Sequence, residues 1–176
     1  FASPMQTEKY LKPLCNGYVR SCFAMTEPEV AGSDPTGIQT FAVRHGDNWH
    51  INGHQWFISG ARGAKFAILI ACTAPDADPP QARNSAFIVD LPNPGFEIVR
   101  DVHTMAGGHN HCEIRIKDLV VPHENMLGPQ GQGHTLGQVR LGPARLAHCM
   151  RWVGQIEKAL DMMIARSEER MLHGDK

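Results

Sequence analysis

Two short stretches of the sequence combine aromatic rings, hydroxyl groups and glycines where predicted strands end. The first, residues 23–34, turns at Pro28 into a loop of small residues, where Gly32 permits close backbone approach and Ser33 offers a hydroxyl. The second, residues 52–60, follows an aromatic pair with a hydroxyl and a glycine. Such strand ends could present ring faces, hydroxyls and free backbone N–H groups to a flat heteroaromatic ligand. The alternative is a hairpin whose aromatic side chains fill the core, and the residues alone leave both interpretations open.

Two other motifs give weaker indications of chemistry. The glycines within residues 131–137 resemble a dinucleotide-binding loop, but the third glycine comes one residue late and the preceding strand ends too far back. We expect a flexible connector there instead. His109, His111 and Cys112 could supply metal ligands, yet two imidazoles and an adjacent thiol do not complete a tetrahedral site. We therefore predict no metal site.

The composition excludes several classes of protein. The 176 residues carry a net charge of −1, so no basic excess exists to neutralise a nucleic acid backbone. No apolar run approaches the roughly 18 residues that a membrane-spanning helix needs. The five cysteines are odd in number and form no C-x-x-C pair, which argues against a disulfide framework. Because the first residue is Phe1, we expect a piece of a longer chain.

Short apolar runs without intervening helices predict an antiparallel β-barrel or sandwich. The Asn52-Gly53 pair predicts a hairpin turn, and the three prolines within residues 73–85 predict a mobile loop. The predicted strands cover residues 21–26, 40–44, 49–59, 66–72, 86–90, 96–100 and 112–121.

A helix is predicted on either side of the strands. Ser3, Pro4 and Gln6 form a capping-box start for a short helix over residues 3–14. Apolar residues recur every three or four positions over residues 144–172, which predicts an amphipathic helix that begins near Pro143 and ends near Gly174. Its apolar stripe requires helices that are not present in this chain.

Taken together and in this order, the two stretches resemble signatures of the acyl-CoA dehydrogenase family. The family's first signature reads Ser/Thr-Glu-Pro-x-Ala-Gly-Ser-Asp, and its second reads Asn-Gly-x-Lys-x-Trp-Ile-Thr. This chain has one extra residue between Glu27 and residues 31–34, and residues 56–59 read Trp-Phe-Ile-Ser. These departures resemble the subgroup of large members often fused to kinase-like domains. The segment from Arg145 and Gly154 to Gly174 resembles the start of the family's C-terminal helical bundle.

The resemblance implies a mainly β fold with flanking helices. Residues 1–19 would be the tail of an N-terminal helical domain. Residues 20–133 would form an antiparallel β-barrel that binds FAD and substrate. Residues 134–176 would be the first long helix of the C-terminal α-bundle.

The resemblance also implies site residues. Phe57 falls where the family has a flavin-stacking Trp, and Ser33 also matches a position near the thioester substrate. Arg145 matches a residue that contacts CoA, although its usual acidic neighbour is Gly142 here. Arg170 matches an arginine that reaches FAD phosphates across a dimer interface, as suits its forked donors. The implied FAD-binding residues are Phe23, Met25, Thr26, Gly32, Ser33, Phe57, Ser59 and Arg170.

The implied reaction is α,β-dehydrogenation of an acyl-CoA thioester to the trans-2-enoyl-CoA, with hydride transfer to flavin N5. An electron-transfer flavoprotein-type acceptor and a homodimer or homotetramer are implied as partners. No residue of this chain matches the family's catalytic Glu, so we assign no catalytic residue here. An acyl-CoA oxidase-like flavoenzyme and a non-catalytic binding barrel remain open. So does the compartment, which would be the cytoplasm in a bacterium and the mitochondrion or peroxisome in a eukaryote.

Overall fold

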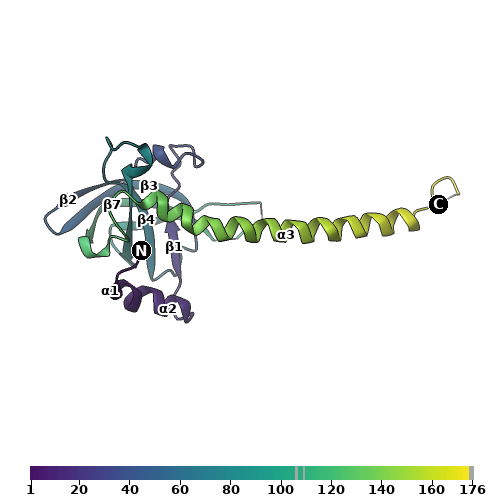
Figure 1. The fold of residues 1–176 in the computed structure, drawn as a ribbon, viewed down its shortest axis with the longest axis horizontal. Coiled ribbons are helices and arrows are strands. Elements are labelled where there is room, and N and C mark those ends of the chain that lie inside the picture. The colour runs from purple at the N-terminus through teal and green to yellow at the C-terminus, as the bar shows by residue number, and fades with distance from the viewer. Residues whose placement is uncertain (106, 109, 175–176) are drawn as a thin grey trace. The chain divides into compact units, whose positions relative to one another are not determined.

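The computed structural model describes residues 1–105, 107, 108 and 110–174, and it divides into two units, Phe1–Leu136 and Gly137–Lys176. The first unit carries two short helices with a π-helical turn between them and seven strands (Figure 1). The second consists mostly of the long helix α3. The elements are α1 (Pro4–Gln6), α2 (Lys12–Cys15), β1 (Ser21–Ala24), β2 (Phe41–His45), β3 (Asn48–Ser59), β4 (Phe66–Cys72), β5 (Asn84–Asp90), β6 (Phe96–Asp101), β7 (His111–Pro122) and α3 (Gly133–Glu169).

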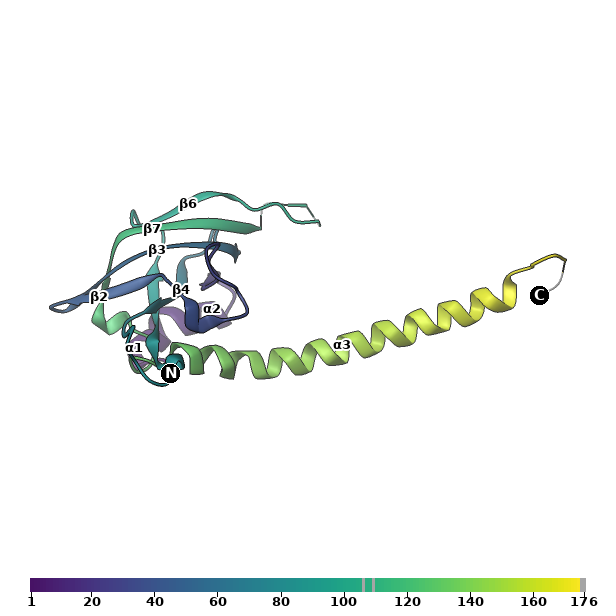
Figure 2. The same cartoon turned by 90° about the horizontal axis from the view of Figure 1, so that it is seen from above.

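The strands form one curled sheet (Figure 2). Their order is β1-β4-β2-β3-β7-β6, with β5 paired to β4. Four pairings are antiparallel, whereas β1 lies parallel to β4, and β2 meets β4 only at the parallel pair of Phe41 and Cys72. The predicted mainly β fold with flanking helices is confirmed. The parallel pairing of β1 is a difference that the strand pattern could not predict, because apolar periodicity does not specify a partner strand.

The core of the first unit lies inside the curl of the sheet. Ile51, Leu69 and Leu119 are fully buried there, and Trp49 packs edge-on against Phe87 at 5.5 Å between ring centroids. Strands β4 and β5 are buried along almost their whole length. Both faces of these strands are covered, which explains why their sequences read as continuous apolar runs.

The N-terminal capping box predicted at Ser3 is confirmed. The N–H of Gln6 donates to Ser3 Oγ at 3.2 Å, and the N–H of Ser3 donates to Gln6 Oε1 at 3.0 Å. The amide of Gln6 also donates to the carbonyls of Glu124 and Met126 at 2.8 and 2.9 Å. The cap therefore fixes the helix start and also ties it to the end of the strand region.

The hairpin turn predicted at Asn52-Gly53 is wrong, because both residues lie inside β3. The turn between β2 and β3 is at Gly46, whose φ is +59°. Gly53 serves a different need: a Cβ there would lie 2.3 Å from Thr40 Oγ1. The glycine thus permits the Thr40 side chain to pack directly against the backbone of β3.

The predicted start of the long helix near Pro143 is also wrong. Helix α3 begins ten residues earlier, at Gly133, and Pro143 lies within it. Leu136 is buried with Ile38 and Ile70, so tertiary packing anchors the first turn. The flexible connector expected over residues 131–137 is accordingly helical from Gly133 onward.

The apolar stripe predicted on the long helix is present and exposed. Its members are between 49% and 69% exposed: Leu146, Met150, Val153, Ile156, Leu160, Met163 and Ile164. Within the described residues, no helix combines the length and the apolar character needed to cross a membrane.

Candidate functional site

The two signature stretches are joined by a reciprocal pair of hydrogen bonds. Thr26, just after β1, donates from Oγ1 to the carbonyl of Trp56 at 2.6 Å, and the N–H of Trp56 donates to the carbonyl of Thr26 at 2.9 Å. Residues 30 positions apart are therefore held side by side at the end of β1 and the middle of β3. The segment between β1 and β2, residues 25–40, is called the first loop below. The first loop and the end of β3 accordingly belong to one surface of the first unit.

A buried carboxylate closes the first loop. Glu27 is only 2% exposed, and its two oxygens accept the backbone N–H groups of Gln39 and Thr40, each at 2.7 Å. Thr40 is itself buried, and its Oγ1 accepts a hydrogen bond from Gln55 Nε2 at 3.2 Å. Sequence analysis missed this role, because the partners of Glu27 lie 12 and 13 residues further along and no local signal identifies them.

The tip of this loop is exposed and ordered by a local turn. Asp34 accepts hydrogen bonds from the N–H and the hydroxyl of Thr36 at 3.0 and 2.6 Å. These bonds from Thr36 hold the pKa of the Asp34 carboxyl below its ordinary value. Within the described part of the chain, no hydrogen bond uses the N–H of Gly32 or Ser33. Both amides therefore stay available to a ligand.

A bulge near the end of β3 turns Phe57 outward. The register against β7 shifts between Gln55 and Ile58, both of which are buried, while Phe57 adopts a φ of +53° and is 43% exposed. A residue other than glycine in this left-handed region costs roughly 1–3 kcal/mol and persists only where the surroundings impose it. Ser59, two positions on, is also exposed and bonds through Oγ to His111 Nδ1 at 2.8 Å.

The other predicted residues fall into two groups. Phe23 and Met25 are half-buried against the cluster that contains Ile70. Arg145 and Arg170 belong to the second unit, where Arg145 Nη2 donates to Gln138 Oε1 at 3.1 Å and the N–H of Arg170 donates to the carbonyl of Arg166 at 3.1 Å. The structure therefore joins Thr26 to the strand that carries Phe57 and Ser59, whereas Arg145 and Arg170 lie in the other unit.

The predicted absence of a metal site concerned His109, His111 and Cys112. His109 lies outside the described residues. No group of three or more potential ligands for a metal ion occurs among the residues that are described. His111 is instead the partner of Ser59.

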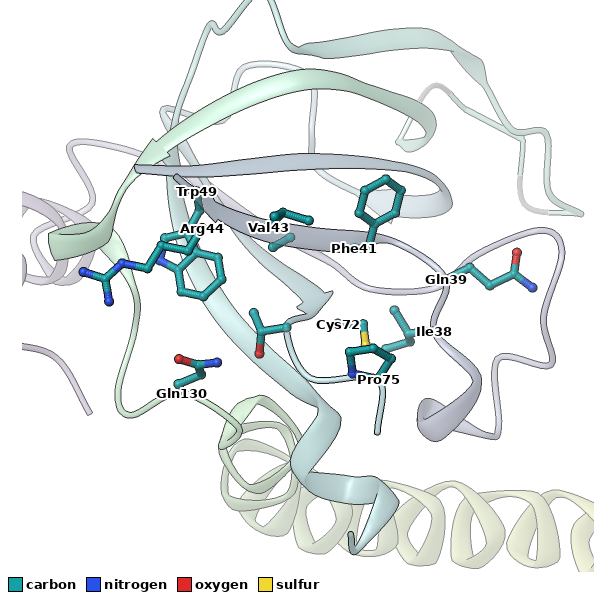
Figure 3. Close-up of a pocket in the computed structure, with 11 residues that line it drawn as sticks. Ile38, Gln39, Phe41, Val43, Arg44, Trp49, Cys72, Pro75 and Gln130 are labelled. Carbon is teal, nitrogen blue, oxygen red and sulfur yellow. The ribbon is translucent and has the colours of Figure 1, made fainter. Parts of the chain in front are cut away.

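Two hollows border the first loop. A shallow depression is lined by Met25, Thr26 and Gly32 together with neighbours of the loop. A groove of about 750 Å³ lies next to it, with Phe41 and Val43 of β2 on one side and Cys72 on the other (Figure 3). Three of the predicted flavin residues, Met25, Thr26 and Gly32, line the depression, and none of the predicted flavin residues lines the groove.

His54 ties the first loop to the sheet through two carboxylates. Its Nδ1 lies 2.7 Å from Glu29 Oε1 and its Nε2 lies 2.9 Å from Glu113 Oε1, while Arg100 Nε donates to Glu113 Oε2 at 2.6 Å. Carboxylates only accept, so both contacts are hydrogen bonds only when the imidazole carries two protons. Burial lowers the pKa of His54, but the bonds to Glu29 and Glu113 outweigh it and raise the pKa overall. The bond from His54, assisted by Arg100, lowers the pKa of Glu113.

This network predicts a specific pH dependence of stability. Because the pKa of His54 is raised in the folded protein, protonated His54 stabilises the fold fully below about pH 6.5. This contribution is lost as the pH rises through the raised pKa. Because the pKa of Glu113 is lowered, its ionised carboxylate stabilises the fold above about pH 4.3. This stabilisation is lost as the pH falls through the lowered pKa. We expect His54→Gln to lower the thermal midpoint of the full-length protein more at pH 6 than at pH 8.5. His45→Gln, whose ring contacts His50 instead, is the control. Equal losses at both pH values would contradict the prediction.

Comparisons with known proteins give concordant results. Residues 22–119 match the family model described as acyl-CoA dehydrogenase, middle domain. The chain is 42% identical over 178 residues to the Mycobacterium tuberculosis protein named probable acyl-CoA dehydrogenase FadE2, with 99% of this chain and 44% of that protein covered. It is 38% identical over 181 residues to mouse acyl-CoA dehydrogenase family member 10, with 99% of this chain and 17% of that protein covered.

A solved structure agrees with these relatives. The crystal structure of acyl-CoA dehydrogenase from Geobacillus kaustophilus matches with a TM-score of 0.84 at 28% identity, over 98% of this chain and 46% of that chain. The chain thus spans less than half the length of each of these three proteins.

Proposed function

The chain belongs to the acyl-CoA dehydrogenase family, whose middle domain it carries, and from this premise we propose that it is the flavin-binding part of an FAD-dependent acyl-CoA dehydrogenase. The whole enzyme would oxidise an acyl-CoA thioester to the trans-2-enoyl-CoA and pass the electrons to an electron-transfer flavoprotein-type acceptor. The observation that carries the proposal is the reciprocal bonding of Thr26 and Trp56, which unites both signature stretches on one surface.

The residues on this surface fit a flavin. Phe57 is exposed, Thr26 and Ser59 offer hydroxyls, and the amides of Gly32 and Ser33 have no hydrogen-bond partner among the described residues. A Cβ at Gly32 would meet only Thr26 Cγ2, at an ordinary 3.6 Å. Because the chain itself has room for a side chain there, the glycine suits the close approach of a ligand backbone or ring.

Each residue has a defined part in this proposal. Phe23, Met25 and Phe57 would provide apolar contacts to the ring system, while Thr26, Ser59 and the amides of residues 32 and 33 would bond its polar edge. Arg170 would bind the pyrophosphate, and Ser33 and Arg145 would contact the acyl-CoA. When bound, FAD supplies the hydride acceptor, and the chain's own residues orient it and exclude water from one face.

The test uses the full-length protein. We expect it to take up FAD, and an acyl-CoA should bleach its flavin absorbance under anaerobic conditions, with recovery on addition of a ferrocenium acceptor. A protein that takes up no FAD would refute the proposal. FAD uptake without bleaching by any acyl-CoA would indicate a binding barrel, and peroxide formed at the rate of substrate loss would indicate an oxidase.

Thr26→Val is expected to weaken FAD binding. The variant loses the bond from Oγ1 to the Trp56 carbonyl, and it loses the hydroxyl proposed to face the flavin. A hydrogen bond of this kind contributes roughly 0.5–1.5 kcal/mol, which corresponds to an increase of about two- to tenfold in the dissociation constant of FAD. Fluorescence titration of the apoprotein measures the change. Thr26→Ser keeps the hydroxyl and should bind FAD as the parent does, whereas equal affinity of all three proteins would contradict the assigned role.

A further inference from the structure

His111 is paired with one of the residues proposed to face the flavin. Ser59 ends β3 and His111 begins β7, and the two are direct register partners. Their side chains meet at 2.8 Å between Ser59 Oγ and His111 Nδ1. The N–H of Gly60 donates to the carbonyl of Asn110 at 2.8 Å, so the backbone next to the pair is also joined. The position of the imidazole relative to the hydroxyl is therefore fixed by the sheet.

The same imidazole lies beside Phe57. The two ring centroids are 6.4 Å apart with a tilt of 59° between the planes. Phe57 keeps its left-handed backbone conformation while the residue remains 43% exposed, so burial in the core does not account for the strain. Strained residues of this kind cluster at ligand sites, where the conformation serves the ligand.

A serine hydroxyl on an exposed surface rotates freely unless a neighbour fixes its direction. The hydroxyl both donates and accepts, and each ring nitrogen of a neutral imidazole does one or the other according to the tautomer. The contact with His111 Nδ1 takes up one hydrogen-bonding direction of Ser59 Oγ, so the remaining capacity of the hydroxyl has a defined direction. His111 thus lies beside both residues, and its hydrogen bond fixes the direction of the Ser59 hydroxyl.

Resting on the proposed function, we infer that His111 is a positioning residue of the flavin site. It holds the Ser59 hydroxyl in the direction in which it bonds the polar edge of the flavin. His111 itself is not required to touch the flavin. Its effect on the flavin should therefore depend on Ser59.

The experiment compares His111→Leu, His111→Asn, Ser59→Ala and the double variant His111→Leu/Ser59→Ala in the full-length protein. The readouts are the visible absorption spectrum of the bound flavin and the dissociation constant of FAD. We expect His111→Leu to raise that constant about two- to tenfold and to shift the spectrum as Ser59→Ala does. The double variant should be no worse than either single variant, since both remove the same interaction. His111→Asn retains a polar group near the position of Nδ1 and should restore most of the parent behaviour.

His45→Leu serves as the control, because that exposed imidazole on β2 contacts only the ring of His50 among the described ring pairs. It should leave the spectrum and the affinity unchanged. An unchanged flavin in His111→Leu, or additive losses in the double variant, would overturn the inference while leaving the proposed function intact. A loss in His111→Asn as large as that in His111→Leu would also overturn it. A parent protein that takes up no FAD would overturn the proposed function and the inference together.

Discussion

Glu27→Ala is expected to lower the free energy of unfolding by about 3–5 kcal/mol and to abolish retention of FAD. Each hydrogen bond between a charged group and a protein partner contributes roughly 1.5–3 kcal/mol, and Glu27 makes two, to the N–H groups of Gln39 and Thr40. The carboxylate is 2% exposed, so water cannot readily replace it. The loop that carries Gly32 and Ser33 would lose its closure, and its free amides would no longer be held in place.

Urea unfolding and FAD titration of the full-length protein measure both effects. Glu29→Ala is the matched control, since that carboxylate lies in the same loop, is 49% exposed and, among the described residues, bonds only His54. Exposed pairs of this kind contribute about 0–1 kcal/mol, so the control should remain near the parent. Glu27→Gln keeps one acceptor and should fall between the two. A Glu27→Ala variant within about 0.5 kcal/mol of the parent would show that the loop closes by other contacts.

Gly53→Ala is expected to destabilise the protein by on the order of 3 kcal/mol, because overpacking and a disrupted hydrogen bond combine. The new Cβ would lie 2.3 Å from Thr40 Oγ1 and 2.7 Å from Thr40 Cβ. Thr40 cannot move aside easily. Its N–H is bound by Glu27 at 2.7 Å, its carbonyl accepts the N–H of Cys72 at 2.7 Å, and its hydroxyl accepts Gln55 Nε2 at 3.2 Å. The substitution should therefore displace the end of the loop and weaken FAD binding as well.

Gly154→Ala provides the matched comparison for Gly53→Ala. Gly154 lies in α3, and a Cβ there would meet nothing within 4 Å. Alanine is favoured over glycine inside a helix by roughly 0.8–1.0 kcal/mol, so this variant should be as stable as the parent or slightly more stable. Chemical denaturation of both variants measures the contrast. If Gly53→Ala were as stable as Gly154→Ala, the close packing on Thr40 would not constrain β3.

Local features of the chain could be predicted from the sequence by itself. The run over residues 66–72 is a strand with the predicted bounds, and the Ser3–Gln6 capping box forms as expected. Both depend on residues a few positions apart, for which the pattern of apolar and polar side chains contains the necessary information. The family was also recognised from the sequence, by the order and composition of the two signature stretches.

Contacts between distant residues could be decided only by the tertiary structure. Asn52-Gly53 has the composition of a turn, but it lies inside β3 because Thr40 packs against Gly53. The helix begins at Gly133 and not at Pro143 because Leu136 is buried against the sheet. In each case a long-range contact overrides a local preference of the chain, which is a weak determinant by comparison.

The candidate site likewise combines features that the sequence predicts with features that only the tertiary structure decides. The sequence left open whether the aromatic pair fills the core or faces a ligand. The bulge in β3 excludes the core for Phe57, because it turns this residue outward between the buried residues Gln55 and Ile58. Glu27 binds amides 12 and 13 residues away, and His111 meets Ser59 across 52 residues of chain. The sequence determined which chemical groups are present, whereas their directions depend on strand register, which only the folded sheet fixes.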